Sequence, residues 1–259
     1  MKPLVTTRWP GLLPRLRQAS INTLFAQAVA SGTVDGEILV DDPGDPRAFY
    51  VVHPYGMTLL IGEPDPGFAA DLFDHLATPG SRSTGHWLQA YPDGWRPLLT
   101  RLCQQASMPT YTRVNFTFDQ ARYQAERAGR ARDGVEVRDV TGDGFGMPGS
   151  VVASAFWRDA DQFAQLGKAF GVSIDGRLAS VAFSSCATED QLELGIETVG
   201  QYRHQGLAWA ACAALVDHCL ASGLEPVWAC RLENTGSYAL AQSLGFVDTL
   251  HWPYFHFPA

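Results

Sequence analysis

The sequence has few cysteines, and their spacing suits neither a disulfide framework nor a zinc site. Among 259 residues there are five cysteines, an odd number, and none forms a Cys-x-x-Cys pair. Bridged scaffolds and zinc sites depend on paired, closely spaced cysteines. We therefore expect reduced thiols in a cytoplasmic protein. The seven histidines show no His-Glu-x-x-His spacing, so the sequence implies no metal.

Long apolar runs are also lacking. No stretch approaches the ~18 apolar residues that a membrane span needs. The N-terminal segment MKPLVTTRWPGLLPRL contains no apolar core of signal-peptide length. We expect neither secretion nor a membrane partner.

Positive charge is in short supply as well. The 19 Lys and Arg residues are outnumbered by 27 Asp and Glu residues, which gives a net charge of −8. Nucleic-acid binding relies on a basic surface, so a nucleic-acid partner is disfavoured. A negative chain attracts a cationic amine instead.

What is present indicates two globular domains. Apolar residues make up 46% of the chain and charged residues 18%, and 259 residues are long for a single core. The polar stretch AGRARDG at 128–134 has little to bury. We therefore place the boundary there, between an N-terminal α+β region at 1–133 and a second domain at 134–259. No internal repeat is evident.

The N-terminal region contains no catalytic motif. Apolar spacing predicts a helix within 12–30, and Pro/Gly punctuation separates strands at EILV, AFYVVH and MTLLIG. Further helices are predicted near 67–77, 94–106 and 119–131, with a strand at YTRVNFTF before the last. This pattern indicates a small α+β unit.

The second domain has a clearer pattern. Asp175-Gly176 between AFGVSI and RLASVAFSS is typical of a two-residue hairpin. Alternation in the strand 191–199 predicts one buried face and one face that carries chemistry. Strands are also expected at 135–140, 225–230, FVDTLHW and YFHFPA, and helices at 156–167, at 206–220 and after Asn234.

A phosphate-binding device is predicted where the strand ending at Val199 leads into the helix that opens at Gly206. Backbone N–H groups at a helix start lack intrahelical acceptors, and the helix dipole adds partial positive charge. Gly206 would let a phosphate approach the backbone, Ala208 keeps the first turn slim, and Arg203 adds a cation. The cradle consists of Arg203, His204, Gln205, Gly206, Leu207 and Ala208, although His204 is equally a solvated loop residue.

The motif Arg203-x-x-Gly206-x-Ala208 after a strand resembles the Gln/Arg-x-x-Gly-x-Gly/Ala signature of the GNAT superfamily of N-acetyltransferases. The order of predicted elements over 134–250 is similar to the GNAT fold. The strings GIETVGQYRHQGLA and WACRLENTGSYALAQSLGF look like a GNAT subfamily with an extra N-terminal region, which includes zwittermicin-resistance acetyltransferases.

The resemblance implies a fold, a cofactor and a reaction. The fold is α/β (α+β), with a mixed, mostly antiparallel sheet flanked by helices, and an amine attacks acetyl-CoA directly, without a covalent enzyme intermediate. The strand before the signature splays from its neighbour in the family, and its free N–H groups, here those of Thr198 and Val199, receive the pantetheine and thioester. Asn234 and Ser237 resemble the start of a second cofactor-contacting helix, although Ser237 is equally a local cap.

Glu197 is the candidate general base. It lies on the predicted polar face of its strand, one residue before the segment that would hold the cofactor, and glutamate is common at this place in the superfamily. The competing interpretation is an exposed strand glutamate without a role.

The candidate general acid departs from the family pattern. Many members carry a tyrosine seven residues after the cofactor-contacting asparagine, where this chain has Ala241. Tyr238 substitutes if its side chain turns toward the cofactor, a water could serve as well, and core packing of Tyr238 is the favoured alternative.

Two further patterns favour a structural interpretation over a functional one. The segment GFGMPG at 144–149 spells G-x-G-x-x-G, but no long helical stripe follows it, so a plain flexible loop is favoured over a dinucleotide turn. His218-Cys219 has no acidic partner in sight, which favours a core thiol over a nucleophile pair.

These patterns predict acetyl transfer to a primary amine on a small molecule, with antibiotic or toxin detoxification as one role. The region 1–133 would wall off one side of the acceptor site. A non-catalytic acyl-CoA-binding sensor or partner-binding module is an alternative, which Ala241 favours and Glu197 opposes. A protein-directed acetyltransferase is a third, and homodimer formation stays open.

Overall fold

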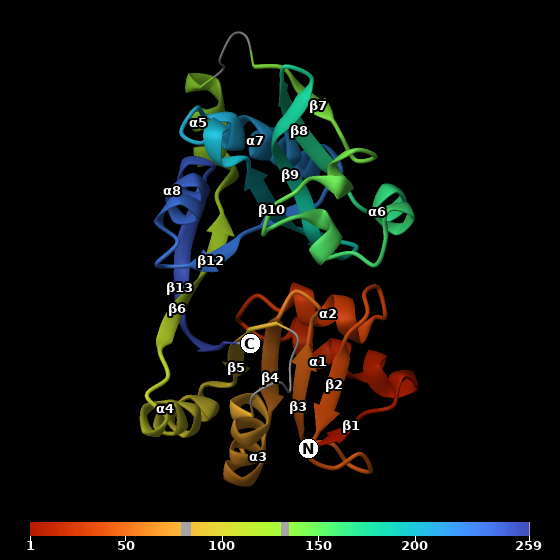
Figure 1. Cartoon of the computed structure of the whole chain (residues 1–259), viewed down its shortest axis with the longest axis vertical. Helices are drawn as coiled ribbons and strands as arrows, with labels where there is room; N and C mark the ends of the chain where they lie inside the picture. Colours follow the sequence, from red (N-terminus) through yellow and green to blue (C-terminus); the bar gives the residue numbers. More distant parts are fainter. Residues whose placement is uncertain (79–83, 131–134, 259) are drawn as a thin grey trace. The chain divides into compact units, whose positions relative to one another are not determined.

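A computed structural model of the chain describes residues 1–78, 84–130 and 135–258. Its residues pack into two compact units (Figure 1). Unit 1 comprises Met1–Val114, Arg231–Glu233 and Leu250–Ala259, and unit 2 comprises Asn115–Cys230 and Asn234–Thr249. The boundary expected at 128–134 falls in part on residues outside the described ranges, and the division at 1–133 and 134–259 stays a prediction.

Unit 1 is built on an antiparallel meander followed by a parallel crossover. Strands β2, β3 and β4 pair antiparallel, and β5 then pairs parallel to β4 after helix α3. The elements are β1 (Lys2–Pro3), η1 (Thr6–Leu12), α1 (Leu13–Arg17), α2 (Leu24–Ala30), β2 (Glu37–Val40), β3 (Ala48–Val52), β4 (Met57–Gly62), α3 (Pro66–Ala77), β5 (His86–Tyr91), η2 (Asp93–Trp95) and α4 (Arg96–Gln105).

The strands predicted in unit 1 are confirmed, but the helix predicted within 12–30 is interrupted. Two short helices, α1 and α2, replace it, and all seven residues of α2 are buried. Hydrogen bonds to side chains favour the break, since Thr23 donates its hydroxyl to the Leu16 carbonyl and Asn22 accepts from the Leu24 N–H. Local polar bonds of this kind compete with a continuous helix.

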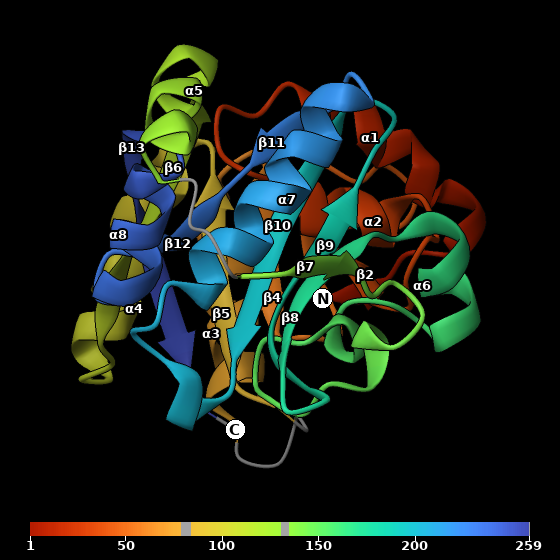
Figure 2. The same ribbon diagram turned by 90° about the horizontal axis from the view of Figure 1, so that it is seen from above.

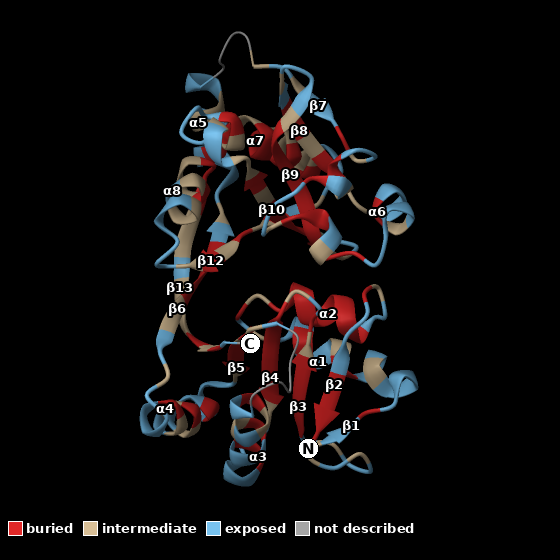
Figure 3. Ribbon diagram, in the orientation of Figure 1, coloured by how far each residue is buried: buried red, intermediate tan, exposed pale blue. Residues whose placement is uncertain are grey.

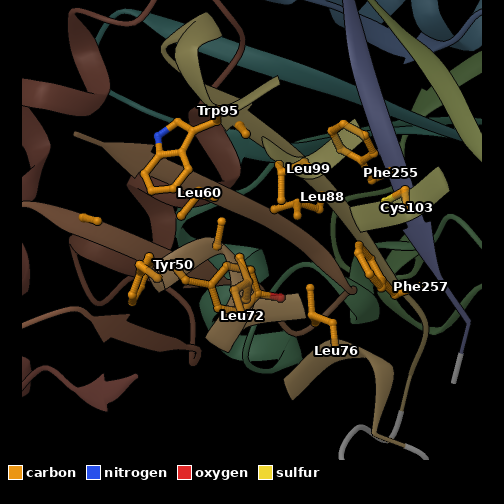
Figure 4. Close-up of a cluster of buried hydrophobic side chains, with 14 of the residues drawn as sticks. Tyr50, Leu60, Leu72, Leu76, Leu88, Trp95, Leu99, Cys103, Phe255 and Phe257 are labelled. Carbon is orange, nitrogen blue, oxygen red and sulfur yellow. The ribbon is translucent and has the colours of Figure 1, made fainter. Parts of the chain in front are cut away.

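One face of the unit 1 sheet forms its hydrophobic core with α3 and α4. Leu88 and Ala90 of β5 lie in this cluster with Tyr50, Leu60 and Trp95. Figure 4 shows the side chains of α3 and α4 meeting those of the strands, together with Phe255 and Phe257 from the end of the chain. Since neighbouring strand residues alternate between faces, the other face of β5 carries Trp87, Gln89 and Tyr91.

Unit 2 contains a five-stranded sheet in the order β11-β10-β9-β8-β7. Helix α7 lies along its strands (Figure 2), and β9 is buried along most of its length, from Ala179 to Cys186 (Figure 3). The elements are α5 (Gln120–Gly129), β7 (Val137–Asp139), η3 (Gly144–Gly146), η4 (Ala153–Ala155), α6 (Ala160–Leu166), β8 (Ala169–Ile174), β9 (Arg177–Ala187), β10 (Gln191–Thr198), η5 (Gly200–Tyr202), α7 (Leu207–Ala221), β11 (Glu225–Val227) and α8 (Thr235–Ser243).

The hairpin predicted at Asp175-Gly176 is confirmed. Both residues have positive φ, +50° and +75°, and Ile174 pairs with Arg177 across the turn. The helix expected over 156–167 begins later, at Ala160, because the Asp159 side chain accepts from the Gln162 N–H and so caps the helix.

Both faces of β10 carry buried residues. Glu193 and Glu197, on the face predicted to carry chemistry, are only 4% and 9% exposed. The loop at 149–151 packs on Glu197 and covers it. The competing interpretation of Glu197 as an exposed strand glutamate was therefore wrong.

Three strands contribute residues to both units: β6 (Thr110–Phe118), β12 (Ala229–Arg231) and β13 (Phe246–Phe257). The strand expected at 225–230 is broken into β11 and β12, and the two closing strands expected after residue 245 form the single strand β13. Together they extend the unit 1 sheet to β1-β2-β3-β4-β5-β13-β6-β12.

The two units repeat one topology. In each, four strands pair antiparallel in sequence (β1 to β4, β7 to β10), a helix follows (α3, α7), and the next strand (β5, β11) pairs parallel to the fourth. The sequence showed no repeat, so the repetition lies in element order rather than in residues. Within the described residues, no helix is long and apolar enough to cross a membrane.

Candidate cofactor cradle

The predicted cradle lies at a strand-to-helix junction. Strand β10 ends at Thr198, the turn η5 follows, and α7 begins at Leu207. Residues 203–206 are exposed. His204 and Gly206 both adopt left-handed backbone conformations, with φ of +61° and +79°. This tight turn needs a glycine or a strained residue, which accounts for Gly206 at the N-cap of the helix.

No side chain caps the first N–H groups of α7. Gly206 has no side chain to cap the helix, and the first N–H bonded into it is that of Ala210, to the Gly206 carbonyl. Four other helices have a side-chain cap, in which the N-cap residue accepts a hydrogen bond from a backbone N–H. These N-caps are Asp65 of α3, Asp119 of α5, Asp159 of α6 and Asn234 of α8. The mouth of α7 therefore has donors to offer to an anionic ligand.

The edge of β10 opens just before the cradle. Its parallel pairing with β11 covers Gln191–Glu193 only, whereas its antiparallel pairing with β9 continues to Thr198. From Leu194 onward the other edge has no strand partner among the described residues. The splay that the resemblance implied is confirmed.

Thr198, at the end of this open edge, is engaged by neighbouring side chains. Its N–H donates to Glu197 Oε1 at 3.1 Å, and its carbonyl accepts from Arg203 Nε at 3.2 Å. Val199 turns the other way, since its N–H donates to the Ala179 carbonyl. Of the two residues predicted to receive the thioester, Thr198 alone presents its N–H on the open edge.

Glu197 lies at the centre of a polar cluster. Its Oε2 accepts from the N–H groups of Ser150 and Val151 at 2.9 and 3.1 Å, and its Oε1 lies 3.5 Å from Arg203 Nη2. A Cβ on Gly149 would meet Glu197 Cγ at 2.5 Å, so only glycine lets the loop come this close. The carboxylate therefore ties the loop at 149–151 to the end of β10.

Arg203 is oriented along the strand end. Its side chain is 60% exposed, and its bonds run to Thr198 and Glu197. Gln205 donates its side-chain amide to the Gln201 carbonyl. Leu207 is buried, and Ala208 is half-buried in the first turn of α7. All six predicted cradle residues are thus brought together at the junction.

The predicted contacts of α8 are placed differently. The Asn234 side chain caps α8 by accepting from the Ser237 N–H, and the Ser237 hydroxyl accepts from Trp228 Nε1 at 3.2 Å. The Tyr238 hydroxyl donates to Asp248 Oδ2 at 2.6 Å, and its ring packs on Phe116. This bond favours the protonated phenol and raises the pKa of Tyr238 above its ordinary value.

The remaining patterns are structural. Cys219 is fully buried, and burial raises the pKa of its thiol to about 12, which disfavours the nucleophilic thiolate. The segment 144–149 forms a 3₁₀ turn packed on β9 at Gly144, and the next helix starts only at Ala160. It is neither a dinucleotide turn nor a plain loop.

Sequence reasoning missed the Ser150 and Val151 donors. They lie 47 and 46 residues before Glu197, so no local spacing connects them. The available signal was Gly149, a glycine in the segment already singled out.

Comparison with known proteins gives consistent matches over nearly the whole chain. A family described as GNAT acetyltransferase matches residues 15–255. The "Uncharacterized N-acetyltransferase YdfB" of Bacillus subtilis (strain 168) is 23% identical over 231 residues, which cover 86% of this chain and 85% of that protein. The match therefore includes unit 1 as well as unit 2.

Two solved structures are similar in fold. A GCN5-related N-acetyltransferase-like protein from Streptococcus suis 89/1591 has a TM-score of 0.74 at 20% identity, covering 98% of this chain and 100% of that chain. A tandem GNAT protein from the clavulanic acid biosynthesis pathway has a TM-score of 0.62 at 13% identity, covering 98% and 97%.

Proposed function

The chain belongs to the GNAT acetyltransferase family and is an acyltransferase enzyme, and we propose that it transfers the acetyl group of acetyl-CoA to a primary amine on a small molecule. The observation that carries this proposal is the uncapped mouth of α7 at the end of the open edge of β10. Free N–H groups and the helix dipole suit the diphosphate of CoA, and the edge suits an extended pantetheine.

The reaction proposed is a direct transfer. The nitrogen of the neutral amine attacks the thioester carbonyl, a C–N bond forms, the C–S bond breaks, and CoA leaves as a thiolate that takes up a proton. The enzyme must orient the two substrates, accept the amine proton and stabilise the developing oxyanion. The Thr198 N–H is the proposed donor to the thioester oxygen.

Glu197 is the proposed general base, acting through water. Its Oε2 is committed to the Ser150 and Val151 N–H groups, so Oε1 is the oxygen that would receive the proton. In the free enzyme this oxygen accepts from the Thr198 N–H. A thioester that takes over this N–H would release Oε1, which couples cofactor binding to activation of the base.

The proton for the thiolate comes from Tyr238 or from water. Tyr238 would have to give up its bond to Asp248 first, and its raised pKa opposes the transfer. The structure therefore favours water. Within the family we propose a place near the zwittermicin-resistance enzymes, a role in detoxification of an amine, and cytoplasmic location. The prediction that residues 1–133 contribute to acceptor recognition stays a proposal.

A screen for CoA release across diverse amines tests the function, and a glycine pair tests the cradle. Gly206→Ala should weaken acetyl-CoA binding by about tenfold or more, because the added Cβ intrudes where the diphosphate would lie. Gly223→Ala is the matched control: Gly223 also has positive φ, at the other end of α7, and its Cβ would meet open space.

The outcomes separate the competing functions. Equal acetyl-CoA affinity of the two variants in calorimetry would contradict the proposal that the diphosphate binds at Gly206. Acetyl-CoA binding without CoA release from any amine would favour a non-catalytic module. Acetylated lysines or N-termini on macromolecules, without small-molecule turnover, would favour a protein-directed enzyme.

A further inference from the structure

Arg203, in unit 2, contacts both residues to which the proposed reaction assigns a role at the end of β10. Its Nε donates to the Thr198 carbonyl at 3.2 Å, and its Nη2 lies 3.5 Å from Glu197 Oε1. Within the described residues, Glu197 is its one carboxylate partner. Oε1 is the oxygen proposed to take the amine proton, so in the free enzyme the guanidinium and the Thr198 N–H both engage it.

The second carboxylate oxygen of Glu197 is not free to replace the first. Oε2 accepts from the N–H groups of Ser150 and Val151 at 2.9 and 3.1 Å, and a Cβ on Gly149 would meet this oxygen at 2.6 Å. The loop thus holds one side of the carboxylate, and only 9% of the residue is exposed. Transfer of the amine proton to the base therefore depends on what engages Oε1.

Arg203 is held less firmly than Glu197. Its side chain is 60% exposed, and it begins the turn at 203–206, which is proposed to receive the diphosphate of CoA. An exposed ion pair contributes little, because water weakens the attraction and the ordered side chains lose entropy. A diphosphate carries more charge than a carboxylate, and its oxygens match the planar set of guanidinium donors. A diphosphate at the start of α7 is therefore the stronger partner for Arg203.

We propose that Arg203 is a positioning residue that restrains the base: it engages Glu197 Oε1 in the free enzyme, and the diphosphate of CoA draws it away when the cofactor binds. This inference rests on the proposed function and deepens it, because the diphosphate then prepares the base as well as anchoring the cofactor. The two ends of the cofactor act on Oε1 separately. The thioester takes the Thr198 N–H, and the diphosphate takes the guanidinium.

An acyl donor without the diphosphate separates these two effects. Acetylpantetheine carries the same thioester, so the C–N bond forms, the C–S bond breaks, and pantetheine leaves as the thiol. With this donor, inorganic pyrophosphate should raise the wild-type kcat by about two- to fivefold, the range that an exposed ion pair supplies. Arg203→Gln should show the higher kcat without pyrophosphate and no rise with it. With acetyl-CoA the same variant should instead have a raised KM, since it lacks a contact to the diphosphate.

NMR spectra of the full chain provide a measurement that needs no turnover. The Nε signal of Arg203 is assigned by its loss in Arg203→Gln, and the side-chain carboxyl signal of Glu197 by its loss in Glu197→Gln. Both signals are followed while pyrophosphate is added to the free enzyme. In the wild type they should shift together, because one contact joins the two groups. In Arg203→Gln the Glu197 signal should not move.

Two variants act as controls. Arg203→Lys keeps the charge but lacks the planar donors that reach Thr198 and Glu197 together, so pyrophosphate should raise its kcat less than that of the wild type. Arg177→Gln removes the same charge from an exposed residue of the β8–β9 hairpin and should keep the wild-type response to pyrophosphate. Thermal melting of each variant shows whether it is folded.

These measurements distinguish failure of the restraint from failure of the proposed function. If no amine is acetylated with either donor, but pyrophosphate moves the Glu197 signal only when Arg203 is present, the proposed reaction fails and the restraint stands. If acetyl transfer occurs, but pyrophosphate leaves the wild-type kcat with acetylpantetheine unchanged or raises it equally in Arg203→Gln, the reaction stands and the restraint is overturned. A Glu197 signal that pyrophosphate does not move in the wild type also overturns the restraint.

Discussion

Glu197 combines a position suited to base catalysis with bonds suited to anchoring. Both oxygens accept hydrogen bonds, three of them from the loop at 149–151 and one from the N–H of Thr198. A residue that only anchored the loop would affect substrate binding and stability. A residue that accepted the amine proton would affect the chemical step, so kinetics distinguish the two roles.

We predict that Glu197→Gln lowers kcat by about 10²- to 10⁴-fold, the usual contribution of general acid–base catalysis, with little effect on acetyl-CoA affinity. The amide is nearly isosteric but cannot accept the proton. Steady-state rates over a range of pH and calorimetry with acetyl-CoA provide the measurement. Ser150→Ala removes only the 3.4 Å hydroxyl contact to the carboxylate and should keep a near-normal kcat. A near-normal rate in Glu197→Gln, or a raised KM at unchanged kcat, would assign the residue to anchoring.

The junction that holds the proposed cradle residues could be predicted from sequence because its structure is local. Six consecutive residues make the turn and begin the helix, and the positive φ at Gly206 is a conformation that glycine adopts without strain. The surroundings of Glu197 and Tyr238 could not be found in this way. Their partners, Ser150 and Asp248, come from other segments, so pairing depends on tertiary packing.

At the scale of elements, α3 and α7 occupy equivalent places in the repeated topology but begin differently. Asp65 caps α3 by accepting from the Phe68 N–H at 2.6 Å, and Pro66, the first residue of the helix, has no N–H to offer. A carboxylate at this end would repel a diphosphate. The N-terminus of α7 has neither a carboxylate cap nor a proline.

We therefore predict one acetyl-CoA site per chain, in unit 2. Isothermal titration of the full chain should give a stoichiometry of one, and Gly206→Ala should weaken that single event without revealing another. A second binding event, or one that persists unchanged in the Gly206 variant, would show that α3 also binds the nucleotide.

The predicted element boundaries agree with the structure where the turn residues strongly favour one conformation, and they differ from it elsewhere. The Asp175-Gly176 hairpin is fixed by residues that tolerate positive φ. The break expected near Pro253 is absent, since β13 runs through it and its register with β5 begins only at Phe255. The missing proline N–H thus interrupts no bond of that register.

At the scale of the whole molecule, the shared strands make the two halves of the sequence dependent on each other. Residues 115–130 belong to unit 2, although they precede the domain boundary drawn from sequence. Tyr123 of α5 is 1% exposed, and its hydroxyl donates to the Ala213 carbonyl of α7 at 2.9 Å. The polar composition of α5 concealed this dependence, because Tyr123 is its one buried residue.

A fragment of residues 134–259 should consequently fail to fold. It lacks Tyr123, whose burial alone is worth about 2 kcal/mol, and the Phe116 N–H that donates to the Trp228 carbonyl. Since domains are stable by only about 5–15 kcal/mol, losses of this kind remove a large share of the total. A fragment of residues 107–259 keeps β6 and α5 and is the matched control. Circular dichroism should show a cooperative melt for the full chain, a melt at lower temperature for 107–259 and none for 134–259. If 134–259 instead melted as cooperatively as the longer fragment, strand β6 and helix α5 would be dispensable to unit 2, and the boundary near residue 134 would stand.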